Sequence, residues 1–236
     1  MVDVGKMLPA PDIAKLVGAL HLGLDALRAL RAQSAGALRD ACSSLIEIGS
    51  RISPIEISGI LQGAANVSRE MRDRIDLVWT GPDVPGSVSR LTSAVVANLV
   101  DQASSDVLLI SYAMYAEPAL TAALARALER GVFVQVLYER NVDNPSYKGE
   151  YVPFVGLKVR RLCWPIDQRP SGASMHAKAL VIDRKVALIG SANMTGPAML
   201  KNIECGVLLR DPTIAAEIYA SIESLLSRQI LQECFS

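Results

Sequence analysis

Net charge, long apolar runs and paired cysteines are all scarce in this 236-residue chain, and each shortage excludes a class of protein. Its 24 basic and 24 acidic residues balance to a formal net charge of zero, so any affinity for a polyanion must come from local clusters. No apolar run reaches the roughly 18 to 20 residues that span a membrane. Residues 1–12 lack the charged start and apolar core of a signal peptide. We therefore expect a cytoplasmic protein without a membrane span.

The cysteines are few and stand alone in the sequence. Cys42, Cys163, Cys205 and Cys234 form no Cys-x-x-Cys pair, which argues against a zinc site and against a disulfide framework. The chain is 50% hydrophobic and 20% charged. That composition argues against disorder and predicts one sizeable core, or a core with a helical subdomain attached.

A Pro/Gly-rich stretch at residues 79–86 predicts a linker between two regions. We expect a helical N-terminal region over residues 1–80 and a second domain over residues 87–236. In the first region, leucine and isoleucine recur at helical spacing over residues 12–31, 35–48 and 54–69. Core packing explains this spacing most simply, and docking of a partner or of nucleic acid is the alternative.

The second domain alternates helical and extended patterns. A helix and a buried strand repeat and then give way to a hairpin, which predicts an α/β fold with a mixed sheet flanked by helices. The expected helices are residues 87–104, 117–130 and 212–233, and the expected strands outside the hairpin are residues 106–112, 132–138, 157–162 and 203–209.

The most informative segment is the hairpin itself. Residues 176–182 alternate polar or small residues with apolar ones, so His176 and Lys178 share one face of a strand. A polar turn and a second apolar strand follow, and the end of that strand brings Ser191 and Asn193 back beside them. An imidazole, an ammonium, a hydroxyl and a carboxamide together suit the binding and transfer of a phosphate.

These residues resemble the HKD motif of the phospholipase D superfamily. The spacing is His176-x-Lys178-x4-Asp183, then Gly190-Ser191-x-Asn193, then Glu204. The match is specific because several polar residue types must fall at fixed offsets within apolar strands. The resemblance implies a single phospholipase D-like domain from about residue 87 onward, and it implies that neither a metal ion nor another cofactor is needed.

The same resemblance implies a role for each motif residue. His176 is the expected nucleophile and forms a phosphohistidine, while Lys178 and Asn193 bind phosphate oxygens. Ser191 assists through its hydroxyl, and Glu204 holds the imidazole in its useful tautomer. Asp183 completes the expected catalytic set, although an aspartate at a strand end also closes a turn.

Histidine is in short supply for this mechanism. The superfamily reaction uses two motif histidines, but the chain has only His21 and His176. His21 falls within an apolar helical pattern and has no lysine two residues later, so we interpret it as structural. The resemblance therefore implies a homodimer in which two chains complete one composite active site.

Further residues are candidates for binding the substrate. Ser111 and Tyr112 end the predicted buried strand over residues 106–112, although a tyrosine in that place also serves packing. Arg160, Arg161 and Arg169 form a basic cluster shortly before His176, and a solvated surface is the alternative for them.

The helical N-terminal region, the junction at residues 78–82 and the single motif resemble more particularly the phospholipase D-like proteins of DISARM anti-phage defence systems. That resemblance implies a bacterial protein with nucleic acid as substrate and other defence proteins as partners. Three hypotheses remain: a metal-independent nuclease, a phospholipase D-type lipid hydrolase, and a catalytically silent nucleic-acid-binding or scaffold subunit. We rank the lipid hydrolase below the nuclease because the sequence shows no amphipathic basic or apolar surface for a bilayer.

Overall fold

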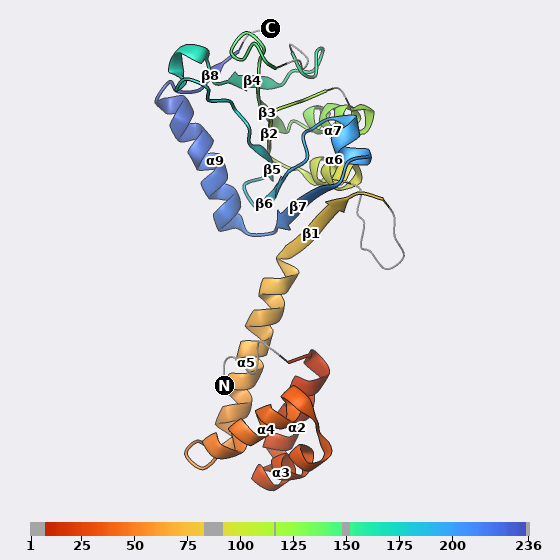
Figure 1. The fold of residues 1–236 in the computed structure, drawn as a ribbon, viewed down its shortest axis with the longest axis vertical. Coiled ribbons are helices and arrows are strands. Elements are labelled where there is room, and N and C mark those ends of the chain that lie inside the picture. Colours follow the sequence, from red (N-terminus) through yellow and green to blue (C-terminus); the bar gives the residue numbers. More distant parts are fainter. Residues whose placement is uncertain (1–7, 83–91, 116, 148–151, 235–236) are drawn as a thin grey trace. The chain divides into compact units, whose positions relative to one another are not determined.

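The computed structural model describes residues 8–82, 92–115, 117–147 and 152–234 of the chain. Contacts between residues divide the chain into two compact units, Met1–Asp73 and Arg74–Ser236. Each unit has a hydrophobic core of its own. Figure 1 labels the elements of both units.

The N-terminal unit is helical, with α2 (Ala10–Leu22), α3 (Leu24–Gln33), α4 (Gly36–Ile48) and α5 (Pro54–Asp73). The single helix expected over residues 12–31 is wrong, because Gly23 adopts φ 102° and ends α2 before α3 begins. Ser53 caps α5. Its hydroxyl accepts from the Glu56 N–H at 3.2 Å, and the Glu56 carboxylate accepts from the Ser53 N–H at 3.1 Å.

The described part of the second unit forms an eight-stranded mixed sheet in the order β1-β7-β6-β5-β2-β3-β4-β8. Pairing is parallel between β2 and β3 and between β3 and β4, and antiparallel elsewhere. The strands are β1 (Ile75–Thr80), β2 (Asp106–Ser111), β3 (Phe133–Tyr138), β4 (Arg160–Cys163), β5 (Lys178–Ile182), β6 (Val186–Gly190), β7 (Glu204–Leu209) and β8 (Gln232–Glu233).

Helices cover both faces of this sheet (Figure 1). On one face, α6 (Thr92–Gln102) and α7 (Pro118–Glu129) pack over side chains such as Leu109 and Val136, and the short helix α8 (Gly196–Leu200) joins them. On the other face, α9 (Pro212–Ser227) covers Leu108 and Val181. The predicted α/β fold with a mixed sheet flanked by helices is confirmed.

Two strands were not expected from the sequence. The end strand β1 pairs with β7, so Trp79 and Thr80 belong to the sheet and not to a linker. Of the predicted linker, residues 83–86 lie outside the described residues. The second unexpected strand is β8, which pairs with β4 near Cys163.

One cysteine pair corrects the expectation from the sequence. The buried residues Cys163 and Cys234 are joined as a disulfide, with Cα atoms 6.1 Å apart, a separation that suits such a bond. They lie 71 residues apart in the sequence, and it is the pairing of β4 with β8 that brings them together. Cys42 and Cys205 are free thiols.

The directions of the strands determine which residues lie together at one end of the sheet. Because β2 and β5 are antiparallel, Ser111 at the end of β2 lies opposite Lys178 at the start of β5. The end of β6 meets the start of β7 at the pair Gly190 and Gly206. The end of β3, which runs parallel to β2, reaches the same edge. Side chains from several distant segments therefore meet at one end of the sheet.

Within the described residues, no helix is both long enough and apolar enough to cross a bilayer.

Candidate active site

The hairpin of β5 and β6 places the first two motif residues at the functional edge of the sheet. His176 is exposed and precedes β5, and Lys178 is the half-buried first residue of that strand. The Lys178 ammonium lies 3.1 Å from Nδ1 and 3.2 Å from Nε2 of His176, and it donates to the His176 carbonyl at 2.8 Å. The imidazole and the ammonium are thus in direct contact.

The surroundings of Lys178 act on its protonation. Burial lowers the pKa of Lys178 from its ordinary value, and the negative charge of Glu204 opposes that shift. The Lys178 ammonium is therefore shielded in part from water, and a nearby negative charge stabilises its protonated form.

Aromatic rings support the imidazole from the side. The ring of Tyr112 lies 4.8 Å from that of His176, measured between centroids, and Tyr147 packs edge-on against Tyr112 at 5.1 Å. The Lys178 ammonium lies 5.5 Å from the centre of the Tyr112 ring. Tyr112, expected to bind substrate, therefore packs against His176 and Tyr147.

Ser191 and Glu204 form a second polar pair. Ser191 follows β6 and Glu204 begins β7, and the Ser191 hydroxyl donates to the Glu204 carboxylate at 2.5 Å. Asn202 donates to the other carboxylate oxygen at 3.1 Å. Within the described residues no hydrogen bond joins Glu204 to His176 of the same chain. The expectation that Glu204 holds this imidazole is therefore not what the structure shows.

The loop after β6 is tied to the end of β2. The Asn193 side-chain oxygen accepts from the Ala113 N–H at 3.1 Å, which fixes the orientation of the carboxamide. Ser111 is fully buried, and its hydroxyl donates to the Ala113 carbonyl while accepting from the Met194 N–H. Ser111 therefore links the segments at Ala113 and Met194, and its binding of substrate stays a prediction.

Asp183 lies at the far end of β5 from His176. Its carboxylate accepts hydrogen bonds from three backbone N–H groups and two hydroxyls of Ser104, Ser105 and Asp106. Together these bonds outweigh the effect of partial burial and hold the pKa of the Asp183 carboxyl well below its usual range. Both Asp183 and Arg184 have positive φ, as a type I′ hairpin turn requires. The structure thus places Asp183 in contacts that hold the hairpin turn to the start of β2, and its catalytic role stays a prediction.

The three arginines expected to bind substrate are engaged elsewhere. Arg161 donates to four backbone carbonyls, those of residues 153, 154, 157 and 159. Arg160 contacts Gln135 and Glu233. Arg169 is buried against Glu139. Each guanidinium contacts other groups of the fold, and the binding of substrate by these residues stays a prediction.

His21 belongs to the N-terminal unit and has a partner there. Its Nε2 lies 2.9 Å from the hydroxyl of Ser58, a buried residue of α5. This contact between α2 and α5 agrees with a structural role. Of the two histidines of the chain, His176 alone belongs to the unit that contains the candidate site.

A groove of about 630 Å³ runs beside the motif residues. His176, Lys178 and Ser191 contribute its polar part. Most of its lining is apolar and comes from β2, β5, β6 and α9: Ile110, Ala177, Ala179, Ile189, Ile218 and Ile222. The sequence did not indicate an apolar groove at this position, because its residues come from segments distant in the chain.

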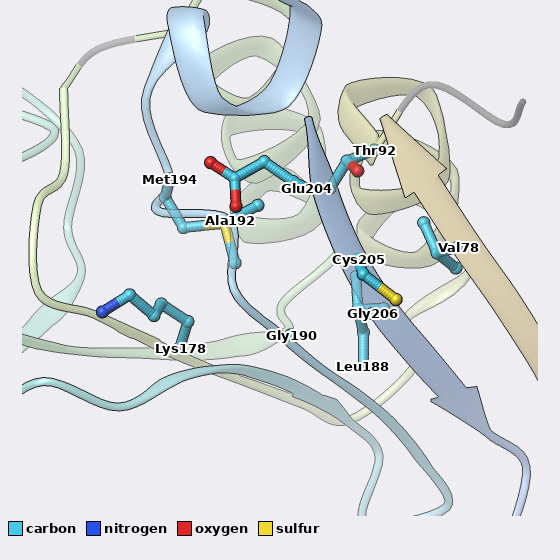
Figure 2. Close-up of a pocket in the computed structure, with 10 residues that line it drawn as sticks. All are labelled: Val78, Thr92, Lys178, Leu188, Gly190, Ala192, Met194, Glu204, Cys205 and Gly206. Carbon is cyan, nitrogen blue, oxygen red and sulfur yellow. The ribbon is translucent and has the colours of Figure 1, made fainter. Parts of the chain in front are cut away.

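A smaller pocket, of about 20 Å³, lies between β5, β6 and β7. Figure 2 shows Lys178 of β5 and Glu204 of β7, which both line this pocket, with Ala192 and Met194 between them. The Cys205 thiol points to the opposite side, toward Val78. In the part of the chain that the structure describes, no three His, Cys, Asp or Glu side chains gather as metal ligands.

Sequence reasoning missed two residues that support this site. Glu139 is fully buried at the end of β3, and its carboxylate accepts from the Met175 N–H, one residue before His176. Tyr147 is buried against Tyr112. A charged residue directly after a buried strand was the available signal for Glu139, whereas Tyr147 lies in an irregular segment and gave none.

Comparison with known proteins agrees with this geometry. A family model described as the cardiolipin synthase, phospholipase D-like domain matches residues 96–226. A phospholipase D of Rickettsia felis is 28% identical over 150 residues, which are 64% of this chain and 68% of that protein. The DISARM protein DrmC of Bacillus paralicheniformis is 27% identical over 143 residues, which are 60% of this chain and 59% of that protein.

The fold is also found among solved structures. The phospholipase D family member Nuc of Salmonella typhimurium superposes with a TM-score of 0.52 at 19% identity, covering 69% of this chain and 98% of that one. Since the family model covers more than half of the chain and includes every motif residue from His176 to Glu204, the chain belongs to the phospholipase D superfamily.

Proposed function

We propose that this protein hydrolyses phosphodiesters through a covalent intermediate on His176, with nucleic acid as the leading substrate class. The observation that carries the proposal is the contact of the His176 imidazole with the Lys178 ammonium, 3.1 Å apart at the rim of an open groove. A nucleophile and a cation for the phosphate oxygens stand side by side there. Membership of the superfamily supports the reaction class.

In the first step, a ring nitrogen of His176 attacks phosphorus, an N–P bond forms and the P–O bond to the leaving group breaks. Lys178 and the amide nitrogen of Asn193 stabilise the charge on the non-bridging oxygens. The Asn193 oxygen already accepts from the Ala113 N–H, so its Nδ2 is the group left to donate to phosphate. In the second step, water attacks phosphorus, the N–P bond breaks and His176 is released, while the group that protonated the leaving oxygen takes the proton of the water.

The leaving oxygen needs a proton, and a second imidazole is the natural donor. His21 is bonded to Ser58 in the helical unit, so we propose that a second copy of this chain brings its own motif to a shared site. The site would be complete only in the homodimer. Dimerisation is thus part of the proposed mechanism.

We prefer nucleic acid because the resemblance to DISARM phospholipase D-like proteins implies this substrate class, and the similarity to DrmC over 60% of the chain supports that resemblance. The name of that relative associates it with DISARM, and we propose a role in anti-phage defence together with other proteins of such a system. We also propose that the protein works in the bacterial cytoplasm.

Phospholipid is the second candidate substrate, and one observation favours it. The groove beside His176 is lined mostly by isoleucine and alanine, and the arginines expected to contact a polyanion are engaged in the fold. An acyl chain in this groove would place a headgroup phosphodiester at Lys178. The relatives named phospholipase D and minor cardiolipin synthase are consistent with it.

The test compares wild type, His176→Ala and the control His21→Gln on single-stranded and double-stranded DNA and RNA and on phosphatidylglycerol vesicles, all in excess EDTA. We expect nucleic acid to be cleaved by wild type and control, and the rate to fall about 10⁴-fold or more in His176→Ala. Hydrolysis of the lipid alone would establish the second candidate. Turnover that persists in His176→Ala, or no turnover of any substrate by a demonstrated dimer, would contradict the proposal.

A further inference from the structure

A charged side chain is fully buried where the described sheet meets the candidate site. Glu139 follows β3, and the side chain has 0% exposure. Burying a carboxylate is costly unless it is paired and hydrogen-bonded. The chemistry proposed for His176, Lys178 and Asn193 makes no use of Glu139, so its burial needs another explanation.

Both oxygens of Glu139 have a neighbour on the segment that leads to His176. One oxygen lies 2.8 Å from Nη1 of Arg169 in an ion pair that forms no hydrogen bond, and the arginine side chain is itself only 2% exposed. The other oxygen accepts from the Met175 N–H at 2.7 Å. A single carboxylate thus links the end of β3 to two points of one segment.

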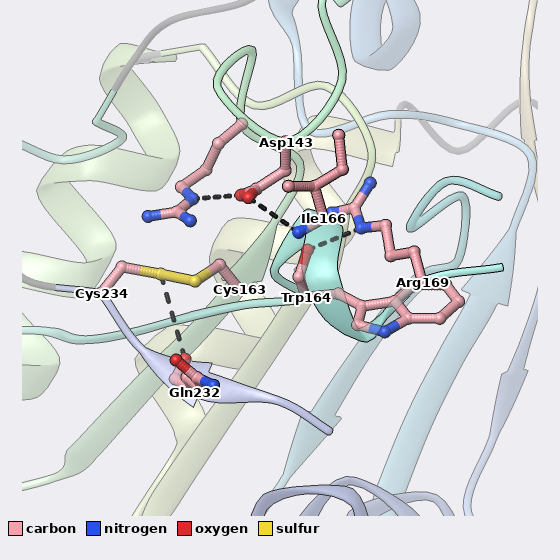
Figure 3. The surroundings of a disulfide bond; sticks show 8 residues. Asp143, Cys163, Trp164, Ile166, Arg169, Gln232 and Cys234 are labelled. Atoms are coloured by element: carbon pink, nitrogen blue, oxygen red, sulfur yellow. Dashed lines mark hydrogen bonds and ion pairs between the residues drawn. A yellow bond between two sulfur atoms is a disulfide. The ribbon is translucent and has the colours of Figure 1, made fainter. Parts of the chain in front are cut away.

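Further contacts shape the same segment before it reaches Met175. Nε of Arg169 donates to the Trp164 carbonyl at 2.6 Å, and its guanidinium lies 5.2 Å from the centre of the Trp164 ring. A second buried carboxylate, that of Asp143, accepts from the Ile166 N–H at 3.1 Å. Figure 3 shows these bonds closing the turn around Ile166.

The hydrogen bond to Met175 acts one peptide away from the proposed nucleophile. His176 lies before β5 begins, so the β-ladder does not fix its backbone. On the ring side, Tyr112 and Lys178 contact the imidazole. On the backbone side, Lys178 donates to the His176 carbonyl. The buried carboxylate of Glu139 accepts from the N–H of the preceding residue, Met175.

We propose that Glu139 is a positioning residue: held by Arg169, it fixes the Met175 N–H and thereby aims the His176 imidazole at phosphorus. Arg169 acts through Glu139 by holding its carboxylate in place. This inference rests on the proposed function for the consequence in catalysis, whereas the geometry it assigns to the resting protein does not depend on any substrate. A misplaced nucleophile would lower kcat and leave KM nearly unchanged, because Lys178 and Asn193 would still bind phosphate.

Two double variants separate positioning from stability. Glu139→Met with Arg169→Met removes both charges and the acceptor for Met175. Glu139→Gln with Arg169→Met also removes both charges but keeps an amide oxygen in reach of the Met175 N–H. Neither variant leaves an unpaired buried charge, so we expect both to fold with similar Tm values. They differ mainly in the one hydrogen bond under test.

We expect kcat to fall about 100-fold in the Met/Met variant and to recover to within about fivefold of wild type in the Gln/Met variant, with KM within about twofold in both. Equal kcat values in two variants of equal Tm would overturn the proposal. So would a loss confined to KM. The single variant Arg169→Lys, which keeps the charge, should fall between wild type and the Met/Met variant.

A second measurement needs no substrate and so separates this inference from the proposed function. The chain has two histidines, so NMR of the imidazoles gives one signal set for His176 and one for His21, assigned with His176→Ala. We expect the His176 signals alone to shift and broaden in the Met/Met variant and to return in the Gln/Met variant. Unchanged His176 signals would overturn the positioning role even if no phosphodiester is cleaved. If the His176 signals shift in the Met/Met variant but the wild type cleaves no phosphodiester, the result would count only against the proposed function.

Discussion

Asp183 shows how a motif residue acquires its role from its contacts. The motif spacing predicts its presence, but the carboxylate faces Ser104, Ser105 and the Asp106 N–H at the opposite end of β5 from His176. Five donor groups around one carboxylate hold the hairpin turn to the start of β2. The conformation of the turn, with positive φ at Asp183, also suits aspartate better than a branched residue.

We predict that Asp183→Asn lowers the free energy of unfolding by about 2 kcal/mol at neutral pH. The asparagine NH₂ group would face N–H and O–H donors of Ser104, Ser105 and Asp106, and the negative charge would be lost. Activity at matched folded protein should stay within a few-fold of wild type. Urea unfolding and turnover at pH 7 measure the two effects, with the exposed Asp167→Asn as control. A folded variant without activity would contradict the structural role.

The same variant has a defined pH dependence. The folded pKa of Asp183 lies below the value of about 3.9 in the unfolded chain, so its contribution is present above that pH and is lost as the pH falls below it. The stability gap between wild type and Asp183→Asn should therefore be constant from pH 8 to about 5 and shrink below about 4. A gap that stays unchanged down to pH 3 would contradict this assignment.

Single residues differed in how far the sequence predicted them. His176, Lys178 and Ser191 stand where strand alternation and the motif indicate, because these signals are local. The roles of Arg161 and Arg169 depend on carbonyls and a carboxylate contributed by other segments. No local sequence pattern distinguishes an arginine that hydrogen-bonds within the protein from one that binds a ligand.

At the level of elements, the approach of β6 to β7 requires a glycine pair. Gly190 lies opposite Gly206, and a Cβ added at Gly190 would stand 2.9 Å from the Cys205 carbonyl oxygen and 3.0 Å from the Gly206 Cα. Both are backbone atoms, so neither can turn away. The close pairing sets the positions of Ser191 and Glu204, which flank it.

We predict that Gly190→Ala forces β6 and β7 apart, lowering the free energy of unfolding by about 1 to 3 kcal/mol and reducing kcat/KM. Thermal unfolding and turnover at a temperature where the variant is folded check both. Gly196→Ala is the matched control, since no atom lies within 4 Å of the added Cβ. Equal behaviour of the two variants would show that the sheet adapts without cost.

Elements with local signals at their ends were predicted well, and elements defined by distant partners were not. The Ser53 capping box and the Asp211 cap mark the starts of α5 and α9 in the sequence. In contrast, β1 and β8 are strands only because β7 and β4 offer them edges. The Cys163–Cys234 disulfide follows from the β8 pairing and could not be read from the spacing of the cysteines.

At the level of the whole molecule, the number of histidines is the constraint with the widest consequences. The N-terminal unit has a core of its own, and His21 contacts Ser58 within that unit. The second unit contributes His176. The proposed mechanism uses one histidine as nucleophile and another as acid, and a site composed of two chains would supply both. This proposal predicts a specific behaviour of mixed dimers.

We predict that a dimer of one wild-type chain and one His176→Ala chain is nearly inactive, because the one remaining imidazole cannot act both as nucleophile and as general acid. Co-expression with two different tags and tandem purification isolates the mixed dimer, and light scattering verifies its mass. We expect its turnover to lie at least about 100-fold below wild type, since general acid catalysis alone contributes about 10²- to 10⁴-fold. A mixed dimer with Lys185→Ala, in the exposed turn at the far end of the hairpin, should retain full activity. Half of the wild-type activity in the His176→Ala mixed dimer would instead show that each chain carries a self-sufficient site, and the proposed second histidine would have to be abandoned.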